Sequence, residues 1–354
     1  MIEIFKAAVQ RGASDIHMKV GDFVRARVHG ELVPLTQQRL ATDQVRQICQ
    51  QLITNVRDRD RFDELTDYDC SWGAPGLGRF RVNILRQRGT PMAVMRVIPI
   101  DIPNFESLRL PAVLAALAQA ERGLVLVTGV TGSGKSSTLA AMVGYINNTR
   151  KKHVITLENP IEFLHRDINC SITQREVGSD TSTFDQGLKS ALREDPDVIM
   201  IGEMRDTTTI DTAMKAGETG HLVLSTLHTT NAVQTITRIV AVFPPHEQEM
   251  VRIRLAETLV GVVSQRLLPR KDGRGRVVAA EVMVVTGTIQ DAILDGDKFH
   301  EIYDLIADGK EQYGSQTFDQ HLRDLVEADL VSYEVAKAAA NNPADFELKM
   351  RTLV

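Results

Sequence analysis

A glycine-rich segment, residues 129–136, constrains the fold of this chain more than any other part of its sequence. It reads GVTGSGKS and matches the pattern G-x-x-x-x-G-K-[ST] at every fixed position. An apolar run over Gly123–Thr128 precedes the segment, and the residues from Ser137 to Tyr145 predict a helix after it. In this pattern, a strand is followed by a glycine-rich turn and then by a helix, and phosphate binds to the turn and the start of the helix. The sequence therefore predicts a P-loop in an α/β domain, and a chance glycine-rich turn is the alternative.

The residue types in this loop suit a nucleotide phosphate. Glycines allow backbone N–H groups to approach phosphate oxygens, and the start of the following helix adds partial positive charge. We expect Lys135 to neutralise the β- and γ-phosphates and the Ser136 hydroxyl to coordinate Mg²⁺. The predicted phosphate-binding set comprises Gly129, Thr131, Gly132, Ser133, Gly134, Lys135, Ser136 and Ser137.

A second apolar run, Asp197–Ile201, ends close to a carboxylate. Near-continuous apolar runs are typical of central parallel strands, and ligands bind at the carboxyl ends of such strands. Glu203 is therefore a candidate to orient or deprotonate an attacking water. Gly202 stands where the Walker B pattern commonly has an aspartate, so other acids should help to order the magnesium shell. A surface glutamate in a turn is the alternative for Glu203.

Two further apolar runs end in polar residues. Glu158 and Glu162 follow the run that begins at His153, and both could face one cluster of metal-bound water. His228 follows the run over Leu222–Thr226 and is a candidate to hydrogen-bond the γ-phosphate. Solvated glutamates at a turn and a structural histidine are the corresponding alternatives.

The N-terminal part of the chain carries arginines on strand-like runs. Arg81 alternates with Phe80, Val82 and Ile84, and Arg96 interrupts a second apolar run. An arginine on such a strand needs a carboxylate or phosphate partner, or a solvated face. Carboxylates of the same domain and a bound nucleotide are both open as partners.

The periodicity of apolar residues changes along the chain and predicts two domains. Residues 1–98 combine alternating strands with helices, which is typical of a small α+β domain. A proline-containing stretch at residues 99–109 predicts a linker. Residues 110–354 alternate apolar strands with helices and predict an α/β domain that continues as helices from about residue 288.

Composition argues against several classes of protein. The formal net charge of −5, from 41 lysines and arginines and 46 acids, gives no reason to expect nucleic acid as a partner. The cysteines, Cys49, Cys70 and Cys170, lack zinc-ligand spacing and suit a reducing compartment. No apolar run reaches the ~18 residues that a membrane span needs. We therefore expect a cytosolic chain without an integral membrane segment.

Longer segments around these residues resemble one known family. They read GVTGSGKSSTLA, ITLENPIEF, DVIMIGEMRD, GHLVLSTLHTTNA and, in the first domain, GRFRVN. In this order they resemble the type II and type IV secretion ATPases, in particular the type IV pilus retraction motors. The resemblance covers essentially the whole chain and implies a PAS-like N-terminal domain, a RecA-like ATPase domain and a ring-shaped homohexamer. It also implies ATP and Mg²⁺ as cofactors, and ATP hydrolysis that drives pilin depolymerisation and twitching motility.

The same resemblance implies roles for individual residues. The family has a catalytic glutamate, acids of an Asp box, a histidine near the γ-phosphate and two arginines that reach a neighbouring subunit's nucleotide. Their counterparts here, in that order, are Glu203; Glu158 and Glu162; His228; and Arg81 and Arg96. The implied location is the cytoplasm at the inner face of the inner membrane, and the implied partners are the platform protein and other parts of the pilus machinery.

Assembly ATPases of pilus extension or type II secretion are the main alternative within this resemblance. Such ATPases commonly carry a four-cysteine zinc loop late in the ATPase domain, whereas the segment Gln265–Arg276 contains no cysteine. A nucleotide-binding adaptor without activity is disfavoured because Lys135, Ser136 and Glu203 are all present. A DNA-translocating motor is disfavoured by the acidic charge balance.

Overall fold

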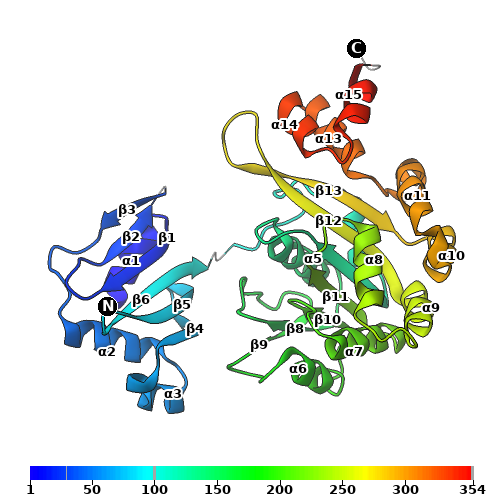
Figure 1. Ribbon diagram of the computed structural model, residues 1–354. Helices are drawn as coiled ribbons and strands as arrows, with labels where there is room; N and C mark the ends of the chain where they lie inside the picture. Colours follow the sequence, from blue (N-terminus) through cyan, green and yellow to red (C-terminus); the bar gives the residue numbers. More distant parts are fainter. Residues whose placement is uncertain (29, 99–100, 352–354) are drawn as a thin grey trace. The chain divides into compact units, whose positions relative to one another are not determined.

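The fold is described here from a computed structural model, which covers residues 1–28, 30–98 and 101–351 (Figure 1). Contacts divide the chain into two compact units. The first runs from Met1 to Asp101 and includes Pro160–Leu164, and the second contains residues 102–159 and the chain from His165 onward.

The first unit is built on a six-stranded sheet in the order β3-β2-β1-β6-β5-β4. Every neighbouring pair of strands in it is antiparallel, as the alternating apolar pattern predicts. Helices α1 and α2 help to enclose a core that includes Phe5, Cys49 and Phe80. The elements are α1 Ile2–Gln10, β1 Ala13–Lys19, β2 Arg25–Val28, β3 Glu31–Pro34, α2 Thr42–Leu52, α3 Val56–Asp60, the 3₁₀ helix Phe62–Glu64, β4 Asp67–Ala74, β5 Gly78–Gln87 and β6 Thr90–Ile98.

The second unit is built on a seven-stranded sheet in the order β13-β12-β7-β11-β10-β8-β9. The strands from β12 to β9 pair in parallel, and β13 adds an antiparallel edge to β12. The strands are β7 Gly123–Thr128, β8 His153–Glu158, β9 Ser171–Glu176, β10 Val198–Ile201, β11 Leu222–Leu227, β12 Leu259–Pro269 and β13 Arg276–Val284.

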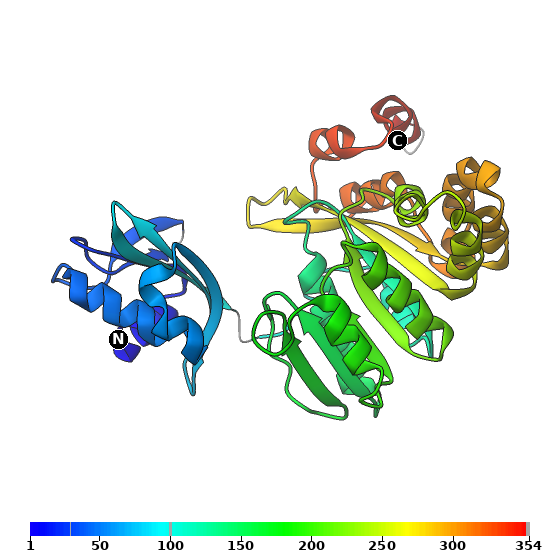
Figure 2. The ribbon, with the colours of Figure 1, turned by 60° about the horizontal axis from the view of Figure 1, so that its bottom comes forward.

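Helices cover both faces of this sheet, because successive side chains of a strand point to opposite faces. Leu124 and Leu126 of β7 face one apolar cluster, and Val125 and Val127 face the other. The first cluster is closed by α6, α7, α8 and α9, which Figure 2 shows beside the sheet, and the second by α4 and α5. These helices are α4 Val113–Ala118, α5 Lys135–Thr149, α6 Phe184–Ala191, α7 Thr207–Glu218, α8 Ala232–Ala241 and α9 Gln248–Thr258.

The chain ends in a series of helices, as predicted from about residue 288. Phe318 and Leu322 of α13 pack on Leu268 and Val277 of the β12–β13 hairpin, so that the last helices extend the second unit. The helices are α10 Gly287–Leu294, the 3₁₀ helix Gly296–Glu301, α11 Ile302–Asp308, α12 Lys310–Tyr313, α13 Phe318–Glu327, α14 Tyr333–Ala339 and α15 Pro343–Arg351.

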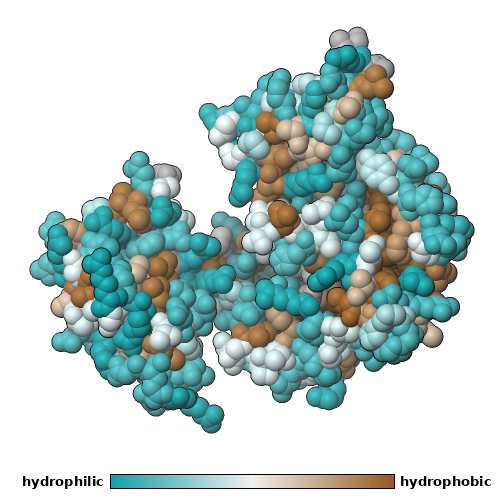
Figure 3. Space-filling model, in the orientation of Figure 1, coloured by the Kyte–Doolittle hydropathy of each residue, from teal (hydrophilic) through white to brown (hydrophobic). Residues whose placement is uncertain are grey.

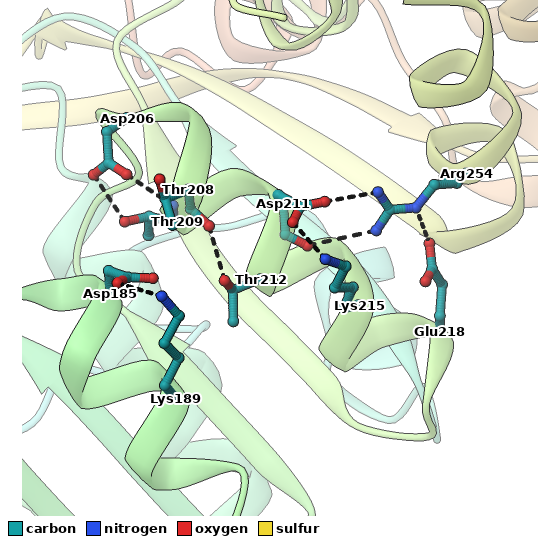
Figure 4. A network of polar contacts seen from close by, with 10 residues as sticks. All are labelled: Asp185, Lys189, Asp206, Thr208, Thr209, Asp211, Thr212, Lys215, Glu218 and Arg254. Carbon is teal, nitrogen blue, oxygen red and sulfur yellow. Dashed lines mark hydrogen bonds and ion pairs between the residues drawn. The ribbon is translucent and has the colours of Figure 1, made fainter. Parts of the chain in front are cut away.

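A polar network holds α9 on α7 (Figure 4). Arg254 of α9 donates from Nη1 to Asp211 Oδ1 over 2.7 Å and from Nε to Glu218 Oε1 over 2.5 Å. Lys215 donates to the second oxygen of Asp211 over 2.7 Å. Hydrogen bonds of this kind fix geometry because a planar guanidinium engages two carboxylates at once. The network therefore sets how α9 lies on α7, the helix that follows the Glu203 loop.

The predicted linker, residues 99–109, includes apolar side chains that pack. Residues 99–100 lie outside the described residues, but Phe105 and Leu108 pack against the core of the second unit.

Hydrophilic residues cover most of the surface visible in Figure 3. Among the described residues, no helix is both long and apolar enough to cross a membrane.

Candidate functional site

The predicted P-loop forms a tight turn between β7 and α5. Gly129, Gly132 and Gly134 have φ angles of +141°, +80° and +95°, which other residues rarely adopt. A Cβ atom on Gly129 would lie 2.5 Å from both the Gln265 carbonyl oxygen and Ser133 Oγ. Glycine is therefore required at residue 129 by both conformation and space. Because α5 begins at Lys135, its first N–H groups have no acceptor within the helix and face the loop.

Lys135 occupies the centre of this turn and is only 9% exposed. Its Nζ donates to the carbonyl oxygens of Gly129 and Val130 over 2.8 and 3.0 Å. Ser136, by contrast, is exposed on the first turn of α5, where its hydroxyl is accessible. One protein hydroxyl suits Mg²⁺, which keeps several waters and binds substrate phosphates. The described residues contain no cluster of three or more His, Cys, Asp or Glu that could hold a metal without the nucleotide.

The parallel register brings the ends of four strands to one edge of the sheet. Thr128 of β7 pairs with Leu227 of β11, and Ser225 of β11 pairs with Ile201 of β10. Ile201 in turn pairs with Leu157 of β8. The segments that lead to Lys135, His228 and Glu203, and the end of β8 with Glu158, therefore lie side by side at the edge where ligands bind in open parallel sheets.

Glu203 lies directly after β10 and contacts two other side chains. Its Oε2 is 3.5 Å from His228 Nε2 and 2.8 Å from Arg205 Nε. Glu203 is largely shielded, with 17% of its side chain exposed, whereas His228 and Arg205 are open to solvent. The structure thus brings Glu203 and His228 together. Arg205, which sequence reasoning did not single out, could have been noticed as the cation in the same strand-terminal segment.

Gly202 explains why this strand end lacks the usual aspartate. Its N–H donates to the Leu157 carbonyl over 2.7 Å, which draws the ends of β10 and β8 together. A Cβ atom at this residue would lie 3.3 Å from that carbonyl oxygen and 3.5 Å from Glu158 Cα. A side chain at residue 202 would therefore fit closely and need a small adjustment, while Glu158 supplies a carboxylate at the end of the neighbouring strand β8.

Glu158 is 8% exposed and is held from two sides. Its Oε1 accepts hydrogen bonds from Thr156 Oγ1 over 2.7 Å and from Gln174 Nε2 over 2.9 Å. Thr156 and Gln174 are register partners in β8 and β9, a pairing that requires knowledge of the strand order. Glu162 is exposed and belongs to Pro160–Leu164, the segment grouped with the first unit. The joint action of Glu158 and Glu162 on metal-bound water stays a prediction.

Arg81 and Arg96 lie opposite each other on β5 and β6 of the first unit. Arg96 Nε donates to Asp15 Oδ1 of β1 over 3.0 Å, while 70% of the arginine side chain remains exposed. Arg81 is exposed and lies opposite Ser71 of β4. Asp15 partly occupies Arg96, yet both guanidinium groups remain accessible from solvent.

A phosphate-binding loop, a buried lysine and acids at adjacent parallel strand ends define a P-loop ATPase. Comparison with known sequences then identifies the family: the profile of the Type II/IV secretion system proteins matches residues 1–334, and the chain belongs to that family.

Individual relatives are similar over nearly their whole lengths. The chain is 44% identical to the type IV pilus retraction ATPase PilT of Pseudomonas aeruginosa, over 97% of this chain and 99% of PilT. It is 40% identical to the type IV pilus ATPase PilU of the same organism, over 99% of this chain and 91% of PilU. A crystal structure of the pilus retraction motor PilT with bound ADP matches with a TM-score of 0.90 and 42% identity, covering 98% of each chain. The protein is thus a nucleotide-binding, ATP-hydrolysing pilus ATPase of the PilT and PilU kind, with the predicted α/β fold.

Replacing the P-loop lysine should weaken nucleotide binding. In Lys135→Ala we expect ATP affinity to fall roughly 10- to 150-fold, because a charge-assisted phosphate contact contributes about 1.5–3 kcal/mol. Titration calorimetry with ATP and steady-state phosphate release measure the two effects. Lys189→Ala, an exposed lysine on α6, is the matched control and should leave both unchanged. Unaltered affinity together with unaltered turnover in Lys135→Ala would contradict the P-loop assignment.

Replacing the strand-end glutamate should separate binding from turnover. Glu203→Gln keeps the shape of the side chain but removes its basicity, so ATP binding should persist while turnover falls about 10²- to 10⁴-fold. The dissociation constant for ATP is measured beside the rate of phosphate release. Glu257→Gln, on the exposed side of α9, is the control. Substantial turnover in Glu203→Gln would transfer the role to Glu158 or Glu162.

Proposed function

We propose that this ATPase drives the retraction of type IV pili. The observation that carries the proposal is the end-to-end similarity to a pilus retraction ATPase, at 44% identity over 97% of the chain. The β12–β13 hairpin supports it, because Pro269 pairs directly with Arg276 across a short turn that contains no cysteine. The zinc loop expected of assembly ATPases has no place there.

In the proposed mechanism, the P-loop amides and Lys135 bind the β- and γ-phosphates of ATP. The Ser136 hydroxyl would hold Mg²⁺, which neutralises charge on those phosphates when it is bound. Glu203 orients the attacking water and accepts its proton, and His228 hydrogen-bonds the γ-phosphate. Glu158 and Glu162 order the water around the metal site. Because Oε2 of Glu203 contacts His228, loss of the γ-phosphate would alter the surroundings of Glu203, the proposed base, through the His228 side chain alone.

The proposed assembly is a homohexameric ring in which each site is completed by a neighbour. Arg81 and Arg96 remain exposed on the first unit, so they are available to a nucleotide held by another subunit. An arginine supplied in this way stabilises charge on the transferring phosphoryl group. We place the ring in the cytoplasm, at the inner face of the inner membrane, with the pilus platform protein as its partner and no nucleic acid.

An accessory role is the second candidate, since the chain is also 40% identical to the pilus ATPase PilU over 351 residues. Both candidates use the same hydrolysis, so only pilus behaviour distinguishes them.

Genetic rescue tests the proposal. In the source organism, deletion of the gene should abolish retraction of fluorescently labelled pili, and the wild-type gene should restore it. Glu203→Gln should fail to restore retraction, whereas the exposed control Glu257→Gln should succeed. A deletion strain that assembles no pili would indicate an extension ATPase instead. A strain that still retracts, but with lower force, would support the accessory role, and stoichiometric zinc in the purified protein would count against retraction.

Mixed rings test the contribution of the arginines. The Arg81→Ala/Arg96→Ala variant should be inactive alone, because a trans arginine contributes ~10³–10⁵ in rate. Glu203→Gln should also be inactive alone, yet mixing the two should regain part of the turnover. In such rings an intact Glu203 can lie beside a subunit with intact arginines. Phosphate release is measured after verifying hexamers by light scattering. Wild-type hydrolysis by hexamers of the arginine variant would disprove the trans role.

A further inference from the structure

A buried glutamate lies near the catalytic loops although none of the mechanism above uses it. Glu281 of β13 is 2% exposed, and its Oε1 accepts the backbone N–H of Ala232 over 2.7 Å. Ala232 is the first residue of α8, and only three residues separate it from His228. The side chain therefore holds the start of the helix that follows the proposed γ-phosphate contact. An anionic group at a helix N-terminus interacts favourably with the helix dipole.

The segment between His228 and α8 is fixed at further points. Asn231 caps the helix by accepting the Gln234 N–H over 2.8 Å, and Thr229 Oγ1 lies 2.6 Å from Thr235 Oγ1. Glu281 is the contact in this set that comes from another element, the edge strand of the sheet. It ties the start of α8 to the edge strand β13, in addition to the contact that His228 makes with Glu203.

The sheet register also connects Glu281 with the P-loop. Glu281 pairs with Ser264 of β12, and Ser264 pairs with Thr128 of β7, the residue before Gly129. Ser264 Oγ accepts a hydrogen bond from Thr128 Oγ1 over 2.9 Å, and both hydroxyls are buried. A row of polar side chains thus runs across three strands inside an otherwise apolar sheet. Apolar residues would fill this row at lower desolvation cost, so a positional role is a physical reason for its polarity.

Charged neighbours of Glu281 come from β12 and from the C-terminal helices. Arg266 of β12 acts on Glu281 through its positive charge, which favours the ionised carboxylate. Arg266 donates to the Ala339 carbonyl and to Asn341 Oδ1, between α14 and α15. Asp319 of α13 and the Tyr303 phenol of α11 are the other titratable groups whose fields reach Glu281.

These opposing influences place the pKa of the Glu281 carboxyl near neutral pH. The pKa of the Glu281 carboxyl is raised from 4.5 to about 7: burial raises it most and Asp319 adds to this, while the Ala232 N–H and Arg266 lower it. The carboxyl is therefore protonated in mildly acidic solution and ionised above neutral pH. The strength of its bond to the start of α8 changes across that range, because an ionised acceptor makes the stronger hydrogen bond.

We propose that Glu281 is a positioning residue for ATP hydrolysis: its ionised carboxylate anchors the start of α8 and thereby holds the His228 loop in place over the nucleotide. Arg266 favours the ionised form of the carboxylate and contacts the C-terminal helices. The proposal rests on ATP hydrolysis and on the role of His228 proposed above, and it is independent of whether the protein retracts pili.

The substitution Glu281→Gln tests this role in the full-length protein. The amide oxygen can still accept the Ala232 N–H, but the charge is lost. Above pH 8 we expect kcat to fall about three- to tenfold, the range that a helix-terminus charge supports. Near pH 6 the two proteins should have similar kcat values, and the KM for ATP should not change because the P-loop is untouched. The ratio of wild-type to variant kcat should rise through about pH 7. Titrations common to both proteins cancel in this ratio.

Thermal stability separates positioning from a merely structural role. The unfolded chain loses its Glu281 proton near pH 4.5 and the folded chain near pH 7, so burial of this group lowers stability as pH rises between those values. Glu281→Gln should therefore melt at the same temperature as the wild type at pH 8, or higher, even though kcat has fallen. A lower melting temperature with a raised KM would show a structural role and overturn the proposal. An unchanged kcat ratio across pH would overturn it as well.

A second variant leaves Glu281 itself intact. Arg266→Gln removes the cation that favours the ionised carboxylate, so Glu281 should ionise at a higher pH. The pH midpoint of the rise in kcat should therefore lie higher in Arg266→Gln than in the wild type. Asn341→Ala is the matched control: it removes one of the two contacts that Arg266 makes with the C-terminal helices but no charge, and it should leave the pH midpoint unchanged. A midpoint that does not move in Arg266→Gln, or moves equally in both variants, would contradict the link. Glu334→Gln, on exposed α14, controls for loss of a carboxylate elsewhere and should match the wild type.

Discussion

The parallel pairing of β7, β11, β10 and β8 is the constraint on which the rest of the second unit depends. Because each strand is in register with the next, the four loops that follow them leave from one edge. A shift of one residue in any pair would turn every side chain of that strand to the opposite face. Glu203 would then lose His228, and Glu158 would enter the apolar core. The hydrogen-bonded pairing of the strands thus determines which of the proposed catalytic side chains lie beside one another.

The strands and the phosphate loop were open to prediction because their signals are local. The run Gly123–Thr128 appears in the structure as β7 with the same bounds, and the helix after the loop begins at Lys135. Contacts between distant segments were not predictable in this way. A carboxylate of the same domain was one of the two partners left open for Arg96, but which acid it is could not be predicted: Asp15 is 81 residues away in sequence and adjacent only because β1 pairs with β6. The Gln174 contact of Glu158 likewise requires β9 to be the neighbour of β8.

Gly202 shows how one small residue redistributes charge in the site. The Gly202 N–H donates to the Leu157 carbonyl of β8, and a Cβ atom at this residue would lie 3.3 Å from that oxygen. The carboxylate is then supplied from the neighbouring strand by Glu158, which is buried and held by Thr156 and Gln174. From sequence, the missing aspartate is a departure from the Walker B pattern. In the fold, the same position gains a carboxylate that is better fixed, because two hydrogen bonds meet on one of its oxygens.

Three buried charged side chains of this unit are compensated by backbone groups. Lys135 is met by two carbonyl oxygens of its own loop, Glu281 by the first amide of α8, and Asp319 by the Asn341 amide. Backbone dipoles cannot leave a site as a mobile side chain can, so they stabilise a charge only while the local backbone keeps its conformation. Each of these buried charges therefore senses the position of a particular backbone segment. Lys135 depends in this way on the P-loop, Glu281 on the start of α8, and Asp319 on the segment between α14 and α15.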